Sequence, residues 1–314
     1  MAVAIAVGAT VSDFPRLALA SFIAMLALPA SAATYTVVIA GLGGEPAYEQ
    51  KFREYAVAVA SAAETAAGSS NNVVSLSGGG ARAESVKREI KKLAARMNAD
   101  DAAVVVLIGH GSYDGENYRF NLPGPDLTDT ELARLFDELP ARDQLIINAT
   151  SASGAVLERW QKPRRVVITA TKSGGERTAT RFAQYWAQAV ASDAADTNKD
   201  QIVTAAEAYA FATNQVEAAF KSETAMATEH ARMEGDDAGR FTIARLGSAA
   251  LAPDNPEVAA LLSQRGAIEQ DLDRVKGQKA SLPENQYYDQ LEEVLVRLAL
   301  LQKEIDSRMG GGGS

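Results

Sequence analysis

The sequence predicts an α/β domain with a doubly wound, mostly parallel sheet and helices on both faces, followed by a C-terminal helical hairpin. Between residues 34 and 250, short apolar runs alternate with helical stretches, a pattern that builds parallel sheets. The run at residues 102–108 is apolar without interruption, which is typical of a strand covered on both sides. Residues 255–308 carry apolar side chains at heptad spacing, which predicts two helices that pack through one seam.

The elements of the α/β domain follow one another at short intervals. Apolar runs predict strands at residues 36–40, 73–76, 102–108, 144–148 and 166–170. Apolar positions at helical spacing predict helices at residues 46–67, 85–97, 128–139 and 177–190. A polar segment at residues 111–125 interrupts this alternation and reads as a hairpin-like insert. Right-handed connections between these strands would make the sheet doubly wound.

The two ends of the chain differ in character from the domain. Residues 1–33 read as a signal peptide, because Arg16 precedes the short apolar run at residues 17–28 and small residues follow it. We therefore expect export to the periplasm or the medium without a stable membrane anchor; an uncleaved anchor is the alternative. Residues 255–308 form either a hairpin folded back on its own domain or the seam of a homodimer. Residues 309–314 are a Gly-rich tail.

Charge and cysteine content exclude several classes of function. The net charge is -9 and the isoelectric point is about 5.0. Nucleic-acid binding needs a basic surface, so we expect no nucleic-acid partner. The chain contains no cysteine. It therefore has no disulfide, no thiolate metal ligand and no thiol nucleophile.

Two polar motifs follow neighbouring apolar strands. The segment VVVLIGHGS places His110 just after one strand, and QLIINATSASG places Ser151 just after the next. Sites in open α/β sheets form where the strands end at their carboxyl edge. We therefore expect the two side chains to face one another, with the backbone amide near Gly111 as an oxyanion donor. Ser153 is the alternative nucleophile if the register is shifted.

These motifs resemble those of the legumain-type cysteine peptidases, within the wider group that shares the caspase-like fold. The resemblance covers roughly residues 35–245. The Gly-His-Gly sequence around His110 matches the histidine motif, and the Ser-x-Ser-Gly sequence that starts at Ser151 matches the Cys-x-Ser-Gly motif of the nucleophile. The resemblance implies a caspase-like domain at residues 34–250 in which His110 and Ser151 form a degenerate dyad, because Ser151 stands where the nucleophilic cysteine belongs.

The missing thiol favours a pseudopeptidase that binds peptide or protein. Serine stays protonated near neutral pH and needs a well-oriented base in hydrogen-bond contact, whereas cysteine is already partly ionised. Two alternatives stay open. The chain is a serine-type hydrolase that uses Ser151 and His110, or it is a non-catalytic assembly module that acts through the C-terminal hairpin.

Residues 196–207 follow the pattern of a twelve-residue EF-hand loop. Oxygen ligands occupy positions 1, 3, 5, 7 and 12, where position 7 contributes a backbone carbonyl: Asp196, Asn198, Asp200, Ile202 and Glu207. Gln201 stands at position 6, where glycine normally makes a left-handed turn, so we expect weak binding. The sequence predicts a structural calcium ion; an acidic loop that only caps the following helix is the alternative.

Overall fold

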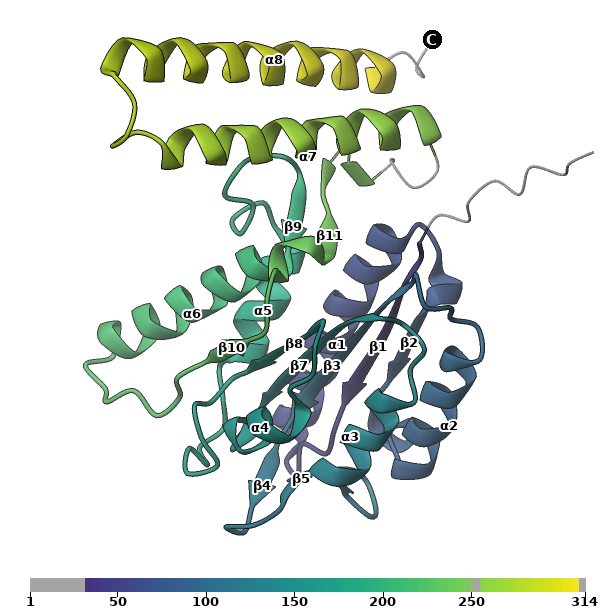
Figure 1. Ribbon diagram of the computed structural model, residues 1–314. Coiled ribbons are helices and arrows are strands. Elements are labelled where there is room, and N and C mark those ends of the chain that lie inside the picture. Colours follow the sequence, from purple (N-terminus) through teal and green to yellow (C-terminus); the bar gives the residue numbers. More distant parts are fainter. Residues whose placement is uncertain (1–31, 248, 251–254, 311–314) are drawn as a thin grey trace, which may run out of the picture. The chain divides into compact units, whose positions relative to one another are not determined.

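A six-stranded sheet forms the centre of the α/β domain in the computed structural model, which describes residues 32–247, 249–250 and 255–310 (Figure 1). The strand order is β2–β1–β3–β7–β8–β10. The strands of this sheet are β1 Thr34–Ala40, β2 Val73–Leu76, β3 Ala102–Gly109, β7 Asp143–Thr150, β8 Arg165–Thr169 and β10 Arg232–Glu234.

The first five strands of the sheet are parallel, and β10 pairs antiparallel with β8 at one edge. This confirms the prediction of a mostly parallel sheet. The sequence did not indicate β10, because three residues are too few to show a strand pattern. The parallel strands all end at one edge, so the segments that follow them gather there.

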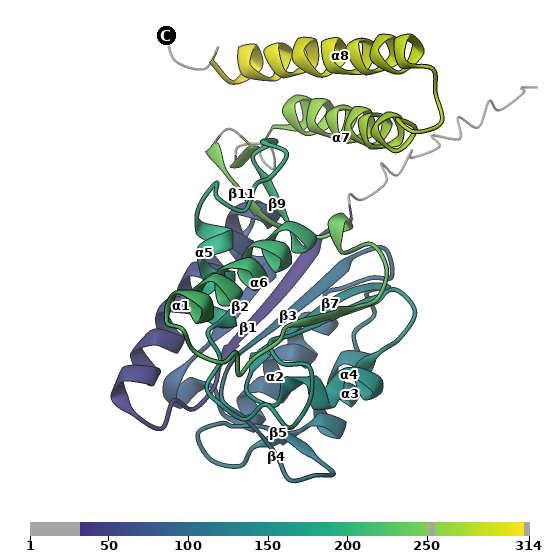
Figure 2. The ribbon, with the colours of Figure 1, turned by 90° about the vertical axis from the view of Figure 1, so that its left-hand side faces the viewer.

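Two groups of helices cover the two faces of the sheet, as Figure 2 shows. On one face lie α1 Pro46–Ala67, α5 Phe182–Ala191 and α6 Ala205–Ser222; on the other lie α2 Ala83–Ala94, α3 Asp129–Asp137 and α4 Leu157–Trp160. Alternate residues of β3 enter the two cores: Val106 and Ile108 face α1, whereas Val105 and Leu107 face α2. A strand covered in this way needs apolar residues at every position, which explains its uninterrupted sequence.

Local signals set the ends of several helices. Pro46 opens α1, and Gly68 ends it with a left-handed backbone. The side chains of Thr128 and Glu131 form a reciprocal capping box at the start of α3. The helix predicted at residues 177–190 begins only at Phe182. Its first predicted residues instead form a connection in which the Thr180 hydroxyl donates to the Ala149 carbonyl at 2.9 Å.

Two small antiparallel sheets accompany the central one. The predicted insert at residues 111–125 contains β4 Gly111–Tyr113 and β5 Tyr118–Phe120, which pair with each other and with β6 Leu127–Thr128. The second small sheet joins β9 Ile202–Thr204 to β11 Thr242–Arg245. The first of these lies where β3 ends, so it borders the edge at which the candidate site residues were expected.

The C-terminal segment consists of α7 Pro256–Gly277 and α8 Glu284–Gly310, which pack against each other. Val275 of α7 and Tyr287 and Val294 of α8 are buried in their shared seam. This confirms the helical hairpin.

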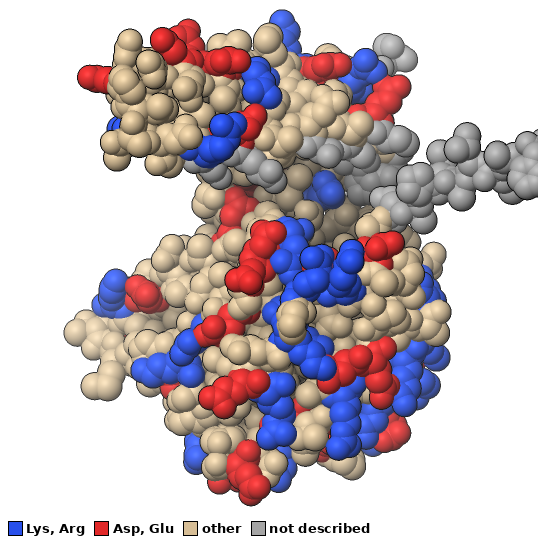
Figure 3. Space-filling model, viewed as in Figure 1, with Lys and Arg blue, Asp and Glu red and all other residues tan. Residues whose placement is uncertain are grey.

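The predicted signal peptide falls almost entirely on residues 1–31, and the Gly-rich tail mostly on 311–314; both lie outside the described residues. Within the described part of the chain, no helix is long and apolar enough to cross a membrane. Acidic and basic side chains are interspersed on the face seen in Figure 3.

Candidate functional site

His110 and Ser151 follow the last residues of neighbouring parallel strands. Gly109 of β3 pairs with Thr150 of β7, so His110 and Ser151 come next at the same level. Ile108 and Ala149, two residues before each, lie in the same core on the α1 face. The His110 ring lies on that face, where it packs against α1, and Ser151 begins the turn that follows β7. The structure thus brings the two predicted residues to one edge of the sheet.

The His110 ring packs edge-on against two aromatic side chains of α1. Its centroid lies 4.9 Å from that of Tyr48 and 5.1 Å from that of Phe52. Burial lowers the pKa of His110 below its ordinary value, while a hydrogen bond with the Gly43 backbone and the charge of Glu45 act in the opposite direction. The imidazole is therefore mostly neutral at pH 7.

The hydrogen-bond partner of the His110 ring is the backbone of Gly43 and not a carboxylate. Gly43 belongs to the turn between β1 and α1, and its amide donates to the Glu49 carboxylate at 2.8 Å. Asp114, which is close to His110 in sequence, instead accepts from Arg119 at 2.7 Å and from the amides of its own turn. No carboxylate thus orients the imidazole in the manner of a serine hydrolase triad, among the residues that the structure describes.

Ser151 sits in a tightly held turn. Its side chain is buried, with only 2% of the residue exposed. Ala152, the next residue, has a φ of 56°, a left-handed conformation that is unfavourable for a residue with a Cβ. The Ala152 amide donates to the Glu176 carbonyl at 2.7 Å, which fixes this conformation. Within the described parts of the chain, no hydrogen bond joins the Ser151 hydroxyl to His110.

Gly111, the predicted oxyanion donor, lies directly against the Ser151 turn. A Cβ added to Gly111 would be 2.5 Å from the Ser151 carbonyl oxygen and 2.6 Å from the Thr150 hydroxyl. Only glycine therefore allows the start of β4 to approach the end of β7 so closely. Gly154 has the same role on the other side of the turn, where an added Cβ would lie 2.2 Å from the Ser173 nitrogen.

Ser153, the alternative nucleophile, has a structural role. Its hydroxyl accepts from the Thr171 amide at 3.1 Å and lies 3.2 Å from the Thr171 hydroxyl. The Gly154 amide donates to that hydroxyl at 2.9 Å. These bonds connect the turn after β7 to the residue that follows β8, and they place the Ser153 side chain in the interior.

A buried polar network lies beneath the turn, on the α2 face of the sheet. The Thr150 hydroxyl is 2.7 Å from the Tyr118 hydroxyl and donates to the Asn148 side-chain oxygen at 2.8 Å. Complete burial raises the pKa of Tyr118 well above its ordinary value, so the phenol stays protonated. The network connects β5 to β7 and supports the carbonyl end of Ser151, to which the Thr150 hydroxyl is 3.1 Å away.

A pocket of about 470 Å³ opens on the α1 face beside the end of β8. Its walls are mostly apolar and come from β8, α5, α6 and the segment before β10: Ala170, Phe182, Val216, Phe220, Ala225 and Ala227 among others. Glu229, only 4% exposed, adds a carboxylate. It accepts from the Arg181 amide at 2.8 and 2.9 Å, and burial raises its pKa to about 7.

The rim of this pocket is joined to the Ser151 turn. His230, which lines the pocket, binds the Glu176 carboxylate through its ring at 2.5 Å and through its amide at 3.1 Å. The Glu176 carbonyl in turn accepts from Ala152. The sequence did not predict this pocket, because its residues come from four separate segments and show no common motif.

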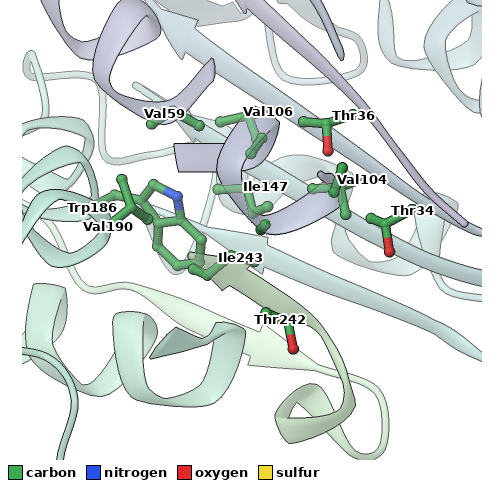
Figure 4. A pocket seen from close by; sticks show the side chains of 13 residues that line it. Thr34, Thr36, Val59, Val104, Val106, Ile147, Trp186, Val190, Thr242 and Ile243 are labelled. Atoms are coloured by element: carbon green, nitrogen blue, oxygen red, sulfur yellow. The ribbon is translucent and has the colours of Figure 1, made fainter. Parts of the chain in front are cut away.

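A much smaller cavity, of about 20 Å³, lies near the opposite end of the sheet (Figure 4). Thr34 and Thr36 at the start of β1, Trp186 of α5 and Ile243 of β11 line it. This volume accommodates about one water molecule. Since β1 runs toward the His110 edge, this cavity is remote from the candidate site.

The EF-hand-like loop is held by hydrogen bonds from its own backbone. The Asp196 carboxylate accepts from the Asp200 and Gln201 amides at 3.1 and 2.9 Å, and Asp200 accepts from the Ile202 amide at 2.7 Å. Gln201 has a φ of 64°, so the side chain at position 6 does occupy the left-handed conformation. Burial raises the pKa of Asp200.

The last predicted calcium ligand serves two partners. Glu207 forms a capping box with Thr204 at the start of α6, and its other oxygen accepts from the Thr197 hydroxyl at 2.8 Å. The Asn198 side chain contacts Asp200 at 3.0 Å. Across residues 32–247, 249–250 and 255–310, no three His, Cys, Asp or Glu side chains lie close enough together to hold a metal ion.

Comparison with protein families and with curated proteins yields no match. Solved structures do match, at low identity. The protein GSU0716 from Geobacter sulfurreducens is 10% identical over 64% of this chain and 92% of its own, with a TM-score of 0.43. The Drosophila initiator caspase Dronc is 10% identical over 68% of this chain and 81% of its own, with a TM-score of 0.40. Raptor from Chaetomium thermophilum is 12% identical over 87% of this chain and 25% of its own, with a TM-score of 0.37.

Proposed function

We propose that this chain is an exported, non-catalytic member of the caspase-like peptidases that binds an extended peptide or protein segment at the edge formed by His110 and Ser151. The carrying observation is the absence of cysteine from all 314 residues, in a chain whose motifs around His110 and Ser151 resemble those of cysteine peptidases. A thiolate attacks without a base in close contact, whereas a serine hydroxyl depends on one.

The surroundings of the two residues support the loss of catalysis. Ser151 is buried and not hydrogen-bonded to His110 among the described residues, and the imidazole contacts two aromatic rings and a backbone group. A hydroxyl in this position is not activated, because proton transfer needs the base within hydrogen-bond reach.

The pocket at residues 170–231 supports retained binding. It opens beside the same edge of the sheet, and apolar walls with one buried carboxylate suit an apolar or basic side chain of a peptide. The bond from Ala152 to Glu176, and from Glu176 to His230, joins the pocket to the Ser151 turn.

Covalent labelling separates this proposal from a serine hydrolase. We expect a fluorophosphonate probe to leave Ser151 unmodified and a fluorogenic peptide library to remain uncleaved. Labelling of Ser151 that disappears in His110→Ala but persists in His230→Ala would establish the hydrolase instead. The second variant is a matched control, because the chain contains only these two histidines.

Binding is tested with a fluorescent peptide library and fluorescence polarisation. The variant Ala227→Trp fills the pocket and should weaken binding at least about tenfold, the loss expected when an anchor pocket is blocked. Met226→Trp is the control, because Met226 is next to Ala227 in the sequence but its side chain is exposed and does not line the pocket. Equal binding by both variants would place the ligand elsewhere, and no binding by the unaltered protein would remove the proposal.

Export has its own test. We expect the protein expressed from the full gene in a bacterium to be recovered from the periplasm or the medium with an N-terminus near residue 33. Retention of residues 1–33 in a membrane fraction would favour the uncleaved anchor.

A further inference from the structure

The helix α8 carries two apolar stripes, and α7 covers only one of them. Tyr287, Val294, Leu301 and Ile305 are buried and form the stripe on the hairpin seam. Four further large hydrophobic side chains remain in solvent: Tyr288 is 52% exposed, Leu295 47%, Val296 50% and Leu300 64%. A hollow in the surface of α8 runs along this second stripe, between Tyr288 and Ala299.

The second stripe has the spacing of a helix–helix contact. Glu292, Val296, Ala299 and Lys303 follow one another at intervals of four, three and four residues, so they lie in one line along α8. With 3.6 residues per turn, this line is roughly opposite the one that faces α7. All four side chains are exposed. The stripe thus has heptad spacing, with Val296 and Ala299 at its centre and one charged residue at each end, and it faces no partner among the described residues.

Charge along α8 is divided between its halves. Residues 284–296 contain four acidic side chains and no basic one, whereas residues 297–310 contain three basic and two acidic ones. Two α8 helices packed side by side in parallel would place acidic half against acidic half. Antiparallel packing places each acidic half against the more basic half of the other helix, which is favourable.

The exposed seam is also symmetric about its own centre. When two copies of α8 are aligned antiparallel about the midpoint between Arg297 and Leu298, Glu292 of one copy lies opposite Lys303 of the other. The same alignment places Leu295 opposite Leu300 and Val296 opposite Ala299. Such self-complementarity is the requirement of a twofold interface, in which residue i contacts j and j contacts i.

We propose that this seam is a homodimer interface, in which α8 of a second copy of this chain packs antiparallel on the stripe of Glu292, Val296, Ala299 and Lys303. The two hairpins then form a four-helix bundle. The interface does not involve the Ser151 edge, so this proposal stands apart from peptide binding. A second copy fits better than an unrelated partner, because the stripe complements itself in residue order and in charge.

Charge exchange tests the proposal on the full chain. The molar mass is measured by sedimentation equilibrium over a range of protein concentrations. We expect a monomer–dimer equilibrium that Glu292→Lys and Lys303→Glu each weaken at least tenfold, because each variant places like charges opposite each other twice. The double variant should restore the dimer, since it re-creates both pairs with the signs exchanged.

The controls separate loss of the interface from loss of the fold. Neither Glu292 nor Lys303 has a described ion pair within the chain, so the exchanges remove no described ion pair. The melting curves of all variants should therefore coincide at protein concentrations low enough for each to be monomeric. Glu64→Lys makes the same charge change on an exposed position of α1 and should leave the dimer intact. A monomer at all concentrations, or a dimer that the double variant fails to restore, would overturn the proposal.

Discussion

At the scale of single residues, glycine decides how closely the turns of the candidate site approach one another. Gly111 lets β4 start against the Ser151 carbonyl, and Gly154 lets the next turn pass against the Ser173 amide. The sequence places both glycines in the motifs that follow the two strands. It could not predict which backbone each glycine contacts, since the contacts come from segments about 20 to 40 residues away.

The contact at Gly154 predicts a large effect of a small substitution. Gly154→Ala forces a methyl group against backbone atoms, so we expect a loss of about 2 kcal/mol in the free energy of unfolding. Urea titration of this variant and of the unaltered chain measures the loss. Gly79→Ala is the control, because no atom lies within 4 Å of a Cβ added at Gly79. Equal stabilities would show that the loop at Ser173 yields at little cost.

Glu229 makes the stability of the folded chain depend on pH with a sign opposite to that of most carboxyl groups. Its folded-state pKa is about 7, above the ordinary value of 4.5, because burial disfavours the charged form. Between these values the folded state binds more protons than the unfolded state, so stability falls as pH rises from about 4.5 to about 7. The loss is at most about 3 kcal/mol.

Unfolding measurements at pH 5 and pH 8 test this. Glu229→Gln should reduce the fall in stability between these two values, whereas Glu217→Gln, on the exposed side of the same pocket, should behave like the unaltered chain. A pH dependence that both variants share would assign the effect to other groups.

The candidate site could be predicted only in part at this scale. His110, Ser151 and Gly111 were found because they follow strong apolar strands, and the sheet register then brings them together. Tyr48 and Phe52, which pack on His110, are spaced by four residues on α1. This spacing is equally typical of helix residues that pack only in a core, so it did not indicate a site. The burial of Glu229 could not be predicted from the sequence, because it depends on the loop that precedes β10.

At the scale of elements, sequence patterns located most helices and strands, but irregular segments shifted some boundaries. The helices α1 and α3 begin within one residue of where the sequence predicted, since proline or a capping box marks their starts. The start of α5 was wrong by five residues, because residues 177–181 make tertiary bonds to Ala149 and Glu229 instead of helical ones. Tertiary contacts of this kind leave no local pattern.

The loop between α5 and α6 yields a prediction at this scale. If residues 196–207 bind calcium, millimolar calcium should stabilise the chain by about 1 kcal/mol and raise its Tm by about 3 °C. Glu207→Gln should abolish the shift, because glutamine can keep the capping box but not the charge.

The chain contains a matched control for this experiment. Glu131 of α3 forms the same capping box with Thr128, far from the loop in sequence. Glu131→Gln should therefore keep its capping box in the same way and retain the calcium shift. No shift in the unaltered chain would leave the loop with only its role in capping α6.

At the scale of the whole molecule, the α/β domain contains its own cores. Both large hydrophobic clusters consist of residues between Ala33 and Leu246, and the seam of the hairpin forms a separate third cluster. The alternation of strands and helices predicted this division, because the heptad pattern begins only after residue 254. Which side of α8 faces α7 and which side stays exposed required the structure, since a heptad pattern alone does not say which positions a neighbouring helix buries.

A variant that ends at residue 254 tests this independence. We expect it to keep the circular dichroism of an α/β protein and one cooperative unfolding transition, and to be monomeric. It loses the hydrogen bond from Arg265 to the Asp200 carbonyl at 3.3 Å. Broad, non-cooperative unfolding would mean that the hairpin is part of the domain core.

The shape of the turn that holds Ser151 does not depend on the Ser151 side chain. Its shape depends on Gly111, Gly154 and the Ala152 amide, and no described hydrogen bond depends on the Ser151 hydroxyl. Exchange of that oxygen for sulfur therefore requires no rebuilding of the scaffold around it. Some serine and cysteine codons differ by one base, so a single point mutation would place a thiol in this turn without removing any described hydrogen bond.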